Sequence, residues 1–187
     1  EYILRKNGID PAADLTIDQS IDFGLTAAAF TSSDADYTVE FEPFATALEQ
    51  EGSGHVVASL GVDSGYVPYT AYSAKKSYLK EHPQIIQSFT NAIQKGLLYV
   101  NSHSAEEIAE TIRPQFPETD EASIAAIVER YKKQDTWKND AIFQEDSFLL
   151  LQNILEQSGE LERRAPYEEL VTTEFAENAL REAENRP

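Results

Sequence analysis

The chain has 187 residues, with 33 acidic against 15 basic side chains and a formal net charge of −18. This balance argues against a nucleic-acid partner, because no basic patch is available to replace the counterions of a phosphate backbone. Cysteine is absent, which excludes disulfides, thiolate chemistry and cysteine-based zinc sites.

Short helical and β-type segments alternate over the first sixty residues. We expect helices over residues 1–7, 25–30 and 43–50, and strands over residues 15–17, 36–39 and 55–60. Strands that are separated by helices at this spacing are typical of a parallel sheet. The sequence therefore predicts an α/β fold for this part of the chain.

The alternation stops at Gly61, and residues 69–72 are the last possible strand. From Ser73 onward the pattern predicts helices. Pro83 suits the first turn of a long helix, and Ser104 with Glu107 forms the sequence pattern of a capping box. Further helices are expected over residues 124–131, 148–155, 168–171 and 175–180.

Glu42 stands directly before Pro43, at the expected junction of a strand and a helix. Proline disfavours helical geometry at the preceding residue and is well suited to the first turn of a helix. In open α/β sheets, ligands bind at the carboxyl ends of strands. Glu42 is thus either a ligand-binding carboxylate or a solvated acid at a turn, and in both cases we expect it to be exposed and to contribute little to stability.

A set of short motifs occurs in a characteristic order along most of the chain. It consists of Gly8-Ile9-Asp10-Pro11, Asp36-Tyr37, Phe41-Glu42-Pro43, Ser64-Gly65-Tyr66-Val67-Pro68-Tyr69-Thr70 and Asp135-Thr136-Trp137. The ordered set resembles the substrate-binding proteins of ABC importers for nitrate, sulfonates, taurine and thiamine-pyrimidine precursors. Each motif is weak alone, and the specificity lies in their order.

The resemblance implies a two-lobed, periplasmic-binding-protein-like fold of type II that is present only in part. Residues 1–68 would form the second α/β lobe, incomplete at its N-terminus, and residues 69–187 would cross a hinge and return to the first lobe as helices. Glu1 falls inside an expected helix without a preceding cap, so we expect the sequence to be a fragment that lacks an N-terminal portion. The helices over residues 83–100 and 148–155 should then expose apolar surface or bury it against a second copy.

Aromatic residues gather at the expected loop and strand ends, where they can line an apolar cleft or belong to the core. The thiamine-pyrimidine branch has an aromatic residue and a glutamate at the corresponding strand end. The resemblance thus implies that Phe41 stacks on a planar heterocycle while Glu42 accepts a hydrogen bond from its amino group. Asp22, Phe23 and Tyr69 are the further candidate ligand-binding residues. No arginine lies in the neighbouring loops, which favours a neutral or cationic ligand over an anion.

Catalytic and metal-binding patterns are missing from the sequence. His55, His82 and His103 are widely spaced, and no metalloprotease, P-loop, dinucleotide-binding or hydrolase motif occurs. Glu40 and Glu42 alternate and could share one side of a strand, but neither has a nucleophile or a metal ligand beside it in the sequence. We expect no catalytic residue, no metal and no cofactor.

The resemblance implies the extracytoplasmic substrate-binding component of an ABC importer, not an enzyme, that captures a small organic molecule by hinge closure. Its partners would be that small molecule and the permease of the importer. It would be periplasmic or a cell-surface lipoprotein, with membrane contact only through a lipid anchor outside this fragment. Two alternatives remain open: a pyrimidine-precursor synthase on the same fold, which uses a cysteine-rich segment that this chain lacks, and a ligand-sensing domain.

Overall fold

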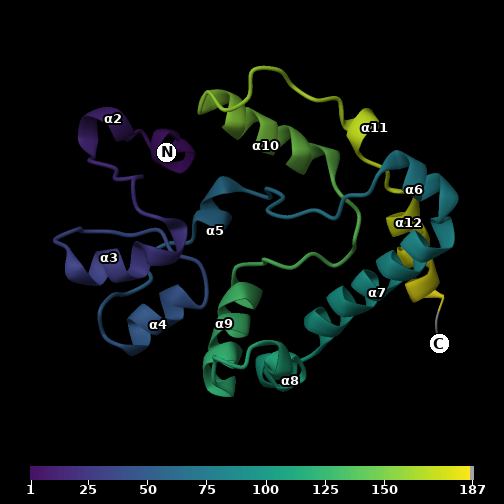
Figure 1. Cartoon of the computed structure of the whole chain (residues 1–187), viewed down its shortest axis with the longest axis horizontal. Helices are drawn as coiled ribbons and strands as arrows, with labels where there is room; N and C mark the ends of the chain where they lie inside the picture. The colour runs from purple at the N-terminus through teal and green to yellow at the C-terminus, as the bar shows by residue number, and fades with distance from the viewer. Residues whose placement is uncertain (186–187) are drawn as a thin grey trace. The chain divides into compact units, whose positions relative to one another are not determined.

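The computed structural model describes residues 1–185, and all of its regular structure is helical (Figure 1). The elements before residue 65 are α1 (Tyr2–Lys6), α2 (Pro11–Asp14), the 3₁₀ turn η1 (Phe23–Leu25), α3 (Thr26–Ser32), α4 (Phe44–Gln50) and α5 (Leu60–Ser64). The later elements are α6 (Lys76–Glu81), α7 (Pro83–Ser102), α8 (Ala105–Ile112), η2 (Arg113–Gln115), α9 (Glu121–Lys133), α10 (Glu145–Gln157), α11 (Tyr167–Leu170) and α12 (Glu174–Glu184).

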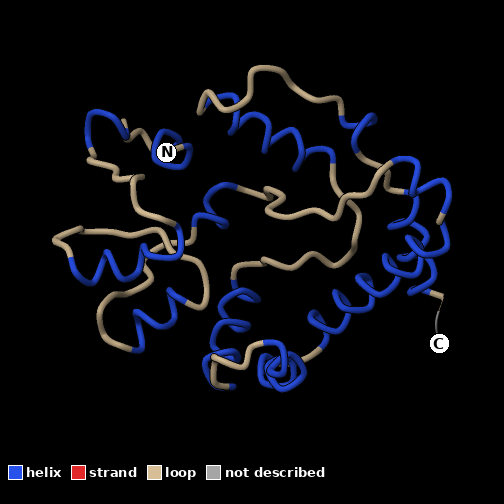
Figure 2. The backbone as a smooth tube through the Cα atoms, viewed as in Figure 1, coloured by secondary structure: helices blue, strands red, loops and turns tan. Residues whose placement is uncertain are grey.

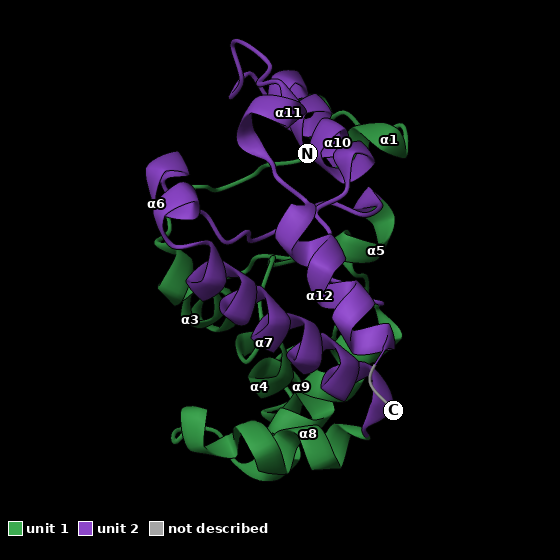
Figure 3. Cartoon of the chain, turned by 90° about the vertical axis from the view of Figure 1, so that its right-hand side faces the viewer, with its two compact units in different colours: residues 1, 3–63, 104–134 green, residues 2, 64–103, 135–187 purple. Residues whose placement is uncertain are grey.

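The chain divides into two compact units (Figure 3). Unit 1 contains residues 1, 3–63 and 104–134, and unit 2 contains residues 2, 64–103 and 135–187. The expected domains, 1–68 and 69–187, stay a prediction. The units found here instead alternate along the chain, which passes from one to the other after residues 63, 103 and 134.

The core of unit 1 lies where α8 packs on α9. Ile108 and Ala109 of α8 and Ile124 and Val128 of α9 are almost completely buried. An isoleucine or valine contributes about 1.5–3 kcal/mol when it is fully buried, so these few side chains hold the pair together. The capping box at the start of α8 is confirmed: the Glu107 N–H donates to Ser104 Oγ at 3.2 Å, and the Ser104 N–H donates to Glu107 Oε2 at 2.8 Å.

In unit 2 the long helix α7 lies alongside α12 (Figure 3). Ala176 and Ala179 of α12 are buried, and their small side chains let the two helices approach closely. Gln94 of α7 is also buried, and its amide bonds to the backbone on both sides of Asp140, donating to the Asn139 carbonyl at 3.1 Å and accepting from the Ala141 N–H at 3.0 Å. A buried amide satisfied in this way fixes the segment after α9 on α7.

The expected α/β fold is wrong. Within residues 1–185 the structure contains no strand (Figure 2), so the parallel sheet, and with it the periplasmic-binding-protein-like architecture, are not observed. The expectation of helices from Ser73 onward is confirmed by α6 to α12, and the early helices over residues 1–7, 25–30 and 43–50 are found as α1, α3 and α4.

The segments expected as strands are irregular for a physical reason. Each has the β-branched or alternating pattern that suits a half-buried sheet, but a strand exists only where a neighbouring strand takes up its N–H and C=O groups. Among the described residues no such ladder forms, and the apolar side chains stay in solvent: Val39 is 60% and Val57 is 76% exposed. Residues 60–64, at the end of the third expected strand, form α5 instead.

Large apolar side chains are also exposed on the two helices for which the sequence predicted an apolar surface. They are Ile85, Phe89 and Leu98 on α7, and Leu149 on α10. The Tyr72 ring packs edge-on against the Phe89 ring, with a distance of 4.8 Å between the ring centroids.

Candidate ligand-binding site

Glu42 lies in the turn before α4 and is held on both carboxylate oxygens. Its Oε1 accepts a hydrogen bond from Arg130 Nη1 at 2.8 Å, and its Oε2 accepts from the Thr46 N–H at 3.0 Å. The side chain is only 5% exposed. The expectation of an exposed carboxylate at a strand end is therefore wrong, because the first turn of α4 and a guanidinium from α9 enclose it.

Arg130 bridges two carboxylates. Its Nη2 also bonds to Glu49 Oε2, while Glu49 Oε1 accepts from the Val56 N–H at 2.9 Å. The pKa of Glu49 lies below its ordinary value, first because of the Val56 hydrogen bond and further because of Arg130. Two carboxylates and one guanidinium leave one net negative charge on this group, which we call the Glu42–Arg130–Glu49 cluster.

Thr46 lies one turn before Glu49, on the side of α4 that meets α9. Residues three and four apart share a helix face, so Thr46, Glu49 and Gln50 point the same way, and Gln50 Nε2 does bond to Ser123 Oγ of α9 at 2.9 Å. The Thr46 side chain is buried, and its hydroxyl has no hydrogen-bond partner within residues 1–185. Such a group costs about 1–3 kcal/mol until something bonds to it.

Phe41, which directly precedes Glu42, forms an aromatic pair with Phe23. Their ring centroids are 5.0 Å apart and the planes are tilted by 56°. Phe23 is 63% and Phe41 is 38% exposed, so both rings keep apolar surface in solvent. The η1 turn positions Phe23: its carbonyl accepts from the Thr26 hydroxyl at 3.1 Å, and the Asp22 carbonyl accepts from the Leu25 N–H at 2.8 Å.

Four of the five predicted site residues thus belong to unit 1, and the structure pairs Phe23 with Phe41. Asp22 is exposed beside this pair, and its side chain caps no helix. Tyr69 is exposed and belongs to unit 2, so its participation stays a prediction. Glu40 and Glu42 have different partners, since Glu40 accepts hydrogen bonds from the hydroxyls of Thr26 and Thr38.

His55 precedes Val56, and its charge contributes to the lowered pKa of Glu49, whereas His82 and His103 lie in unit 2, outside this group of residues. His103 contacts Tyr99, with stacked rings 3.7 Å apart, and His82 packs its ring against Tyr78 at 4.5 Å. Within the described part of the chain, no three histidine, cysteine or acidic residues are arranged to hold a metal ion.

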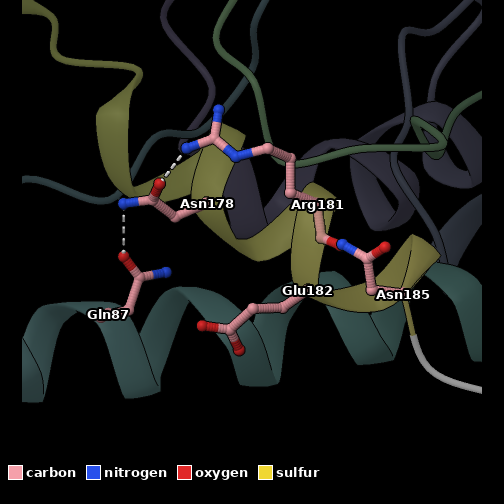
Figure 4. Close-up of a pocket in the computed structure, with 5 residues that line it drawn as sticks. All are labelled: Gln87, Asn178, Arg181, Glu182 and Asn185. Atoms are coloured by element: carbon pink, nitrogen blue, oxygen red, sulfur yellow. Dashed lines mark hydrogen bonds between the residues drawn. The ribbon is translucent and has the colours of Figure 1, made fainter.

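A separate pocket of about 560 Å³ lies in unit 2, where α7 meets α12 (Figure 4). It is lined by Gln87, Asn178, Arg181, Glu182 and Asn185. Figure 4 shows that the lining groups bond to one another: Asn178 Nδ2 donates to Gln87 Oε1 at 3.2 Å, and Arg181 Nη2 donates to Asn178 Oδ1. These bonds join the two helices, which gives the polar lining a structural role.

Arg130, Glu49 and Thr46 are the residues of the candidate site that the sequence did not predict. Arg130 is 88 positions away from Glu42, and nothing in its helical surroundings distinguishes it from the other basic residues of α9. Thr46 and Glu49 could have been found from their spacing of four and seven residues after Glu42, which places them on one side of the following helix.

One curated relative is similar to the chain over nearly its whole length. It is "Putative binding protein YtlA" of Bacillus subtilis (strain 168), to which the chain is 44% identical over 182 residues, 97% of its own length. The alignment covers 54% of that protein, so the chain spans about half the length of this relative. No protein-family model matches the chain, and no solved structure matches it.

Proposed function

We propose that the protein is the substrate-binding component of an ABC importer and captures a small organic molecule. The name of the Bacillus subtilis relative supports a binding function, and the ordered motifs described above support the importer. The proposal includes the permease of the importer as a second partner and an extracytoplasmic location, periplasmic or as a lipoprotein. None of the described helices has the length and apolar character that a membrane span requires.

The exposed aromatic pair Phe23–Phe41, next to Glu42, is the observation that carries the proposal. Two rings that are held 5.0 Å apart and partly exposed offer a planar ligand a large apolar surface at little cost in side-chain entropy. Glu42, which directly follows Phe41 in the sequence, supplies a polar group. A few polar groups at an apolar surface are what a small-molecule site needs.

The charge of the site favours a particular kind of ligand. Although Arg130 is present, two carboxylates surround it, and the cluster keeps one net negative charge. A nitrate or sulfonate ion would be repelled, because an anion needs donors that are not already paired with carboxylates. We therefore propose a neutral or cationic ligand that has a planar ring and an amino group, such as a thiamine-pyrimidine precursor.

Calorimetric titration of the full-length protein with three probes tests the proposal: 4-aminopyrimidine, taurine and nitrate. We expect binding of 4-aminopyrimidine, weakened roughly two- to tenfold in Phe23→Leu and Phe41→Leu, which keep apolar bulk but lose the aromatic faces. Tyr37→Leu is the matched control, because Tyr37 is an exposed aromatic residue outside the pair. Failure of 4-aminopyrimidine to bind while taurine or nitrate binds would refute the proposed ligand chemistry. Failure of all three probes, or equal binding by both phenylalanine variants and the wild type, would refute the site.

Location and partner are tested in cells that produce the full-length protein. We expect it to fractionate with the extracytoplasmic or membrane-anchored proteins and to co-purify with a permease. Recovery in the cytoplasmic fraction alone would contradict the importer.

A further inference from the structure

Arg130 occupies the place on Glu42 that the amino group of a ligand would need. Of the two carboxylate oxygens, Oε2 bonds to the backbone of α4 and Oε1 bonds to Arg130 Nη1 at 2.8 Å. The Thr46 N–H is one of the first N–H groups of α4, which have no partner within the helix, so its bond to Glu42 acts as a cap that a ligand would have to replace. The Glu42 side chain is only 5% exposed, and Arg130 is the flexible side chain among its two partners, so movement of the guanidinium is the simplest way for a ligand to reach the carboxylate.

The second carboxylate makes such an exchange inexpensive. If Arg130 leaves Glu42, its other nitrogen still bonds to Glu49, so the guanidinium does not lose its counter-ion. Arg130 is 22% exposed and can rotate toward solvent while it stays paired with Glu49, and the N–H of the ligand then has to replace the guanidinium as the partner of the buried Glu42 carboxylate. Glu49 itself stays in place, because its other oxygen accepts from the Val56 N–H.

The buried Thr46 hydroxyl, one turn before Glu49 on α4, is a further group to which a ligand atom can bond. Buried hydroxyls are almost always hydrogen-bonded, and this one is buried against α9, the helix that carries Arg130.

From these observations we infer that Arg130 is a displaceable internal cation, which competes with the ligand for Glu42 and thereby sets the affinity and specificity of the site. The inference rests on the proposed function. A molecule binds strongly only if it brings an N–H donor that replaces the guanidinium, while Arg130 retreats to Glu49. The apparent affinity is reduced by the fraction of molecules in which Arg130 still lies on Glu42.

Two substitutions in the cluster should change affinity in opposite directions. In Arg130→Gln the competitor is removed, so 4-aminopyrimidine should bind about three- to tenfold more tightly than to the wild type. In Glu49→Gln the guanidinium has Glu42 as its remaining carboxylate and should stay there, so binding should weaken by about threefold or more. Lys133→Gln removes the same charge from the same helix at an exposed position and should leave the affinity unchanged.

Calorimetry at neutral pH, where this probe is largely uncharged, separates competition from a general charge effect. Weaker binding by Arg130→Gln would show that Arg130 positions Glu42 instead, and equal binding would show that it has no part in the site; either result overturns the inference while the proposed function stands. If the wild type binds none of the probes, the proposed function fails and the inference with it. Should Arg130→Gln not fold, Glu49→Gln decides: unchanged or tighter binding there overturns the inference.

Discussion

Glu42→Gln removes one negative charge from an enclosed ion pair and preserves the size of the side chain. In the native protein the carboxylate accepts two hydrogen bonds, one of them from a guanidinium, and is almost completely buried. Breaking a fully buried pair costs about 3–5 kcal/mol. Here Arg130 keeps Glu49, and glutamine still offers one oxygen, so only part of a charged hydrogen bond is lost and we expect about 1–2 kcal/mol.

Thermal unfolding of the full-length protein measures this loss. For a chain of 150–250 residues, each kcal/mol lowers Tm by about 2–4 °C, so Glu42→Gln should melt roughly 2–8 °C below the wild type. Glu129→Gln is the matched control: it is the same substitution in an exposed i,i+4 pair with Lys133, where the change should stay below about 0.5 kcal/mol.

A double-mutant cycle isolates the contribution of the pair. The destabilisation by Glu42→Gln should shrink when Arg130 is already glutamine, because the lost partner is then absent in both proteins. If Glu42→Gln melts with the wild type, or if its cost is the same in both backgrounds, then the carboxylate does not pair with Arg130 in solution. Glu42 would then not be enclosed as described, and Arg130 could not compete with a ligand for it.

Three further predictions concern other parts of the structure. Because the pKa of Glu49 is lowered, its stabilising contribution is present above its ordinary pKa of 4.5 and is lost as the pH falls through the lower folded value. Glu49→Gln should therefore flatten the acid limb of a profile of stability against pH. Parallel acid limbs in the variant and the wild type would contradict this. Ser104→Ala removes the cap of α8 and should cost about 1 kcal/mol in urea unfolding, and a change below about 0.3 kcal/mol would speak against the capping box that Ser104 forms with Glu107. Gln94→Leu removes both hydrogen bonds of the buried Gln94 amide and should cost roughly 1–3 kcal/mol by the same measurement, whereas a neutral result would show that water replaces the amide.

The helical part of the chain could be predicted because its signals are local. The proline at the start of α7 and the serine–glutamate pair at the start of α8 fix those boundaries by chemistry within one turn, and both are found where the sequence placed them. The strands could not be predicted, since a β-type pattern such as that around Val57 describes a side-chain surface and says nothing of whether a neighbouring strand is present to pair with it.

In the candidate site, too, the local features could be predicted and the contacts between distant residues could not. Phe41 and Glu42 could be singled out from their place before a proline and a helix, and the ring partner Phe23 was among the candidates. The pairing of Glu42 with Arg130 depends on how α4 packs against α9, which brings together residues far apart in the chain. Only the packed structure shows that the carboxylate is already occupied.

The alternation of the two units along the chain limits how the protein can be dissected. Because the chain changes unit after residues 63, 103 and 134, neither unit corresponds to one continuous stretch of sequence. A fragment ending near residue 63 would keep Glu42 and Glu49 but lose Arg130, and with it the bridge and the whole α8–α9 core. Residues 64–103, which separate those two parts in the sequence, carry α7 of unit 2, so their deletion would remove the packing partner of α12 as well. Shortened variants should be judged on that basis, and point substitutions in the intact chain are the sounder way to locate the binding function.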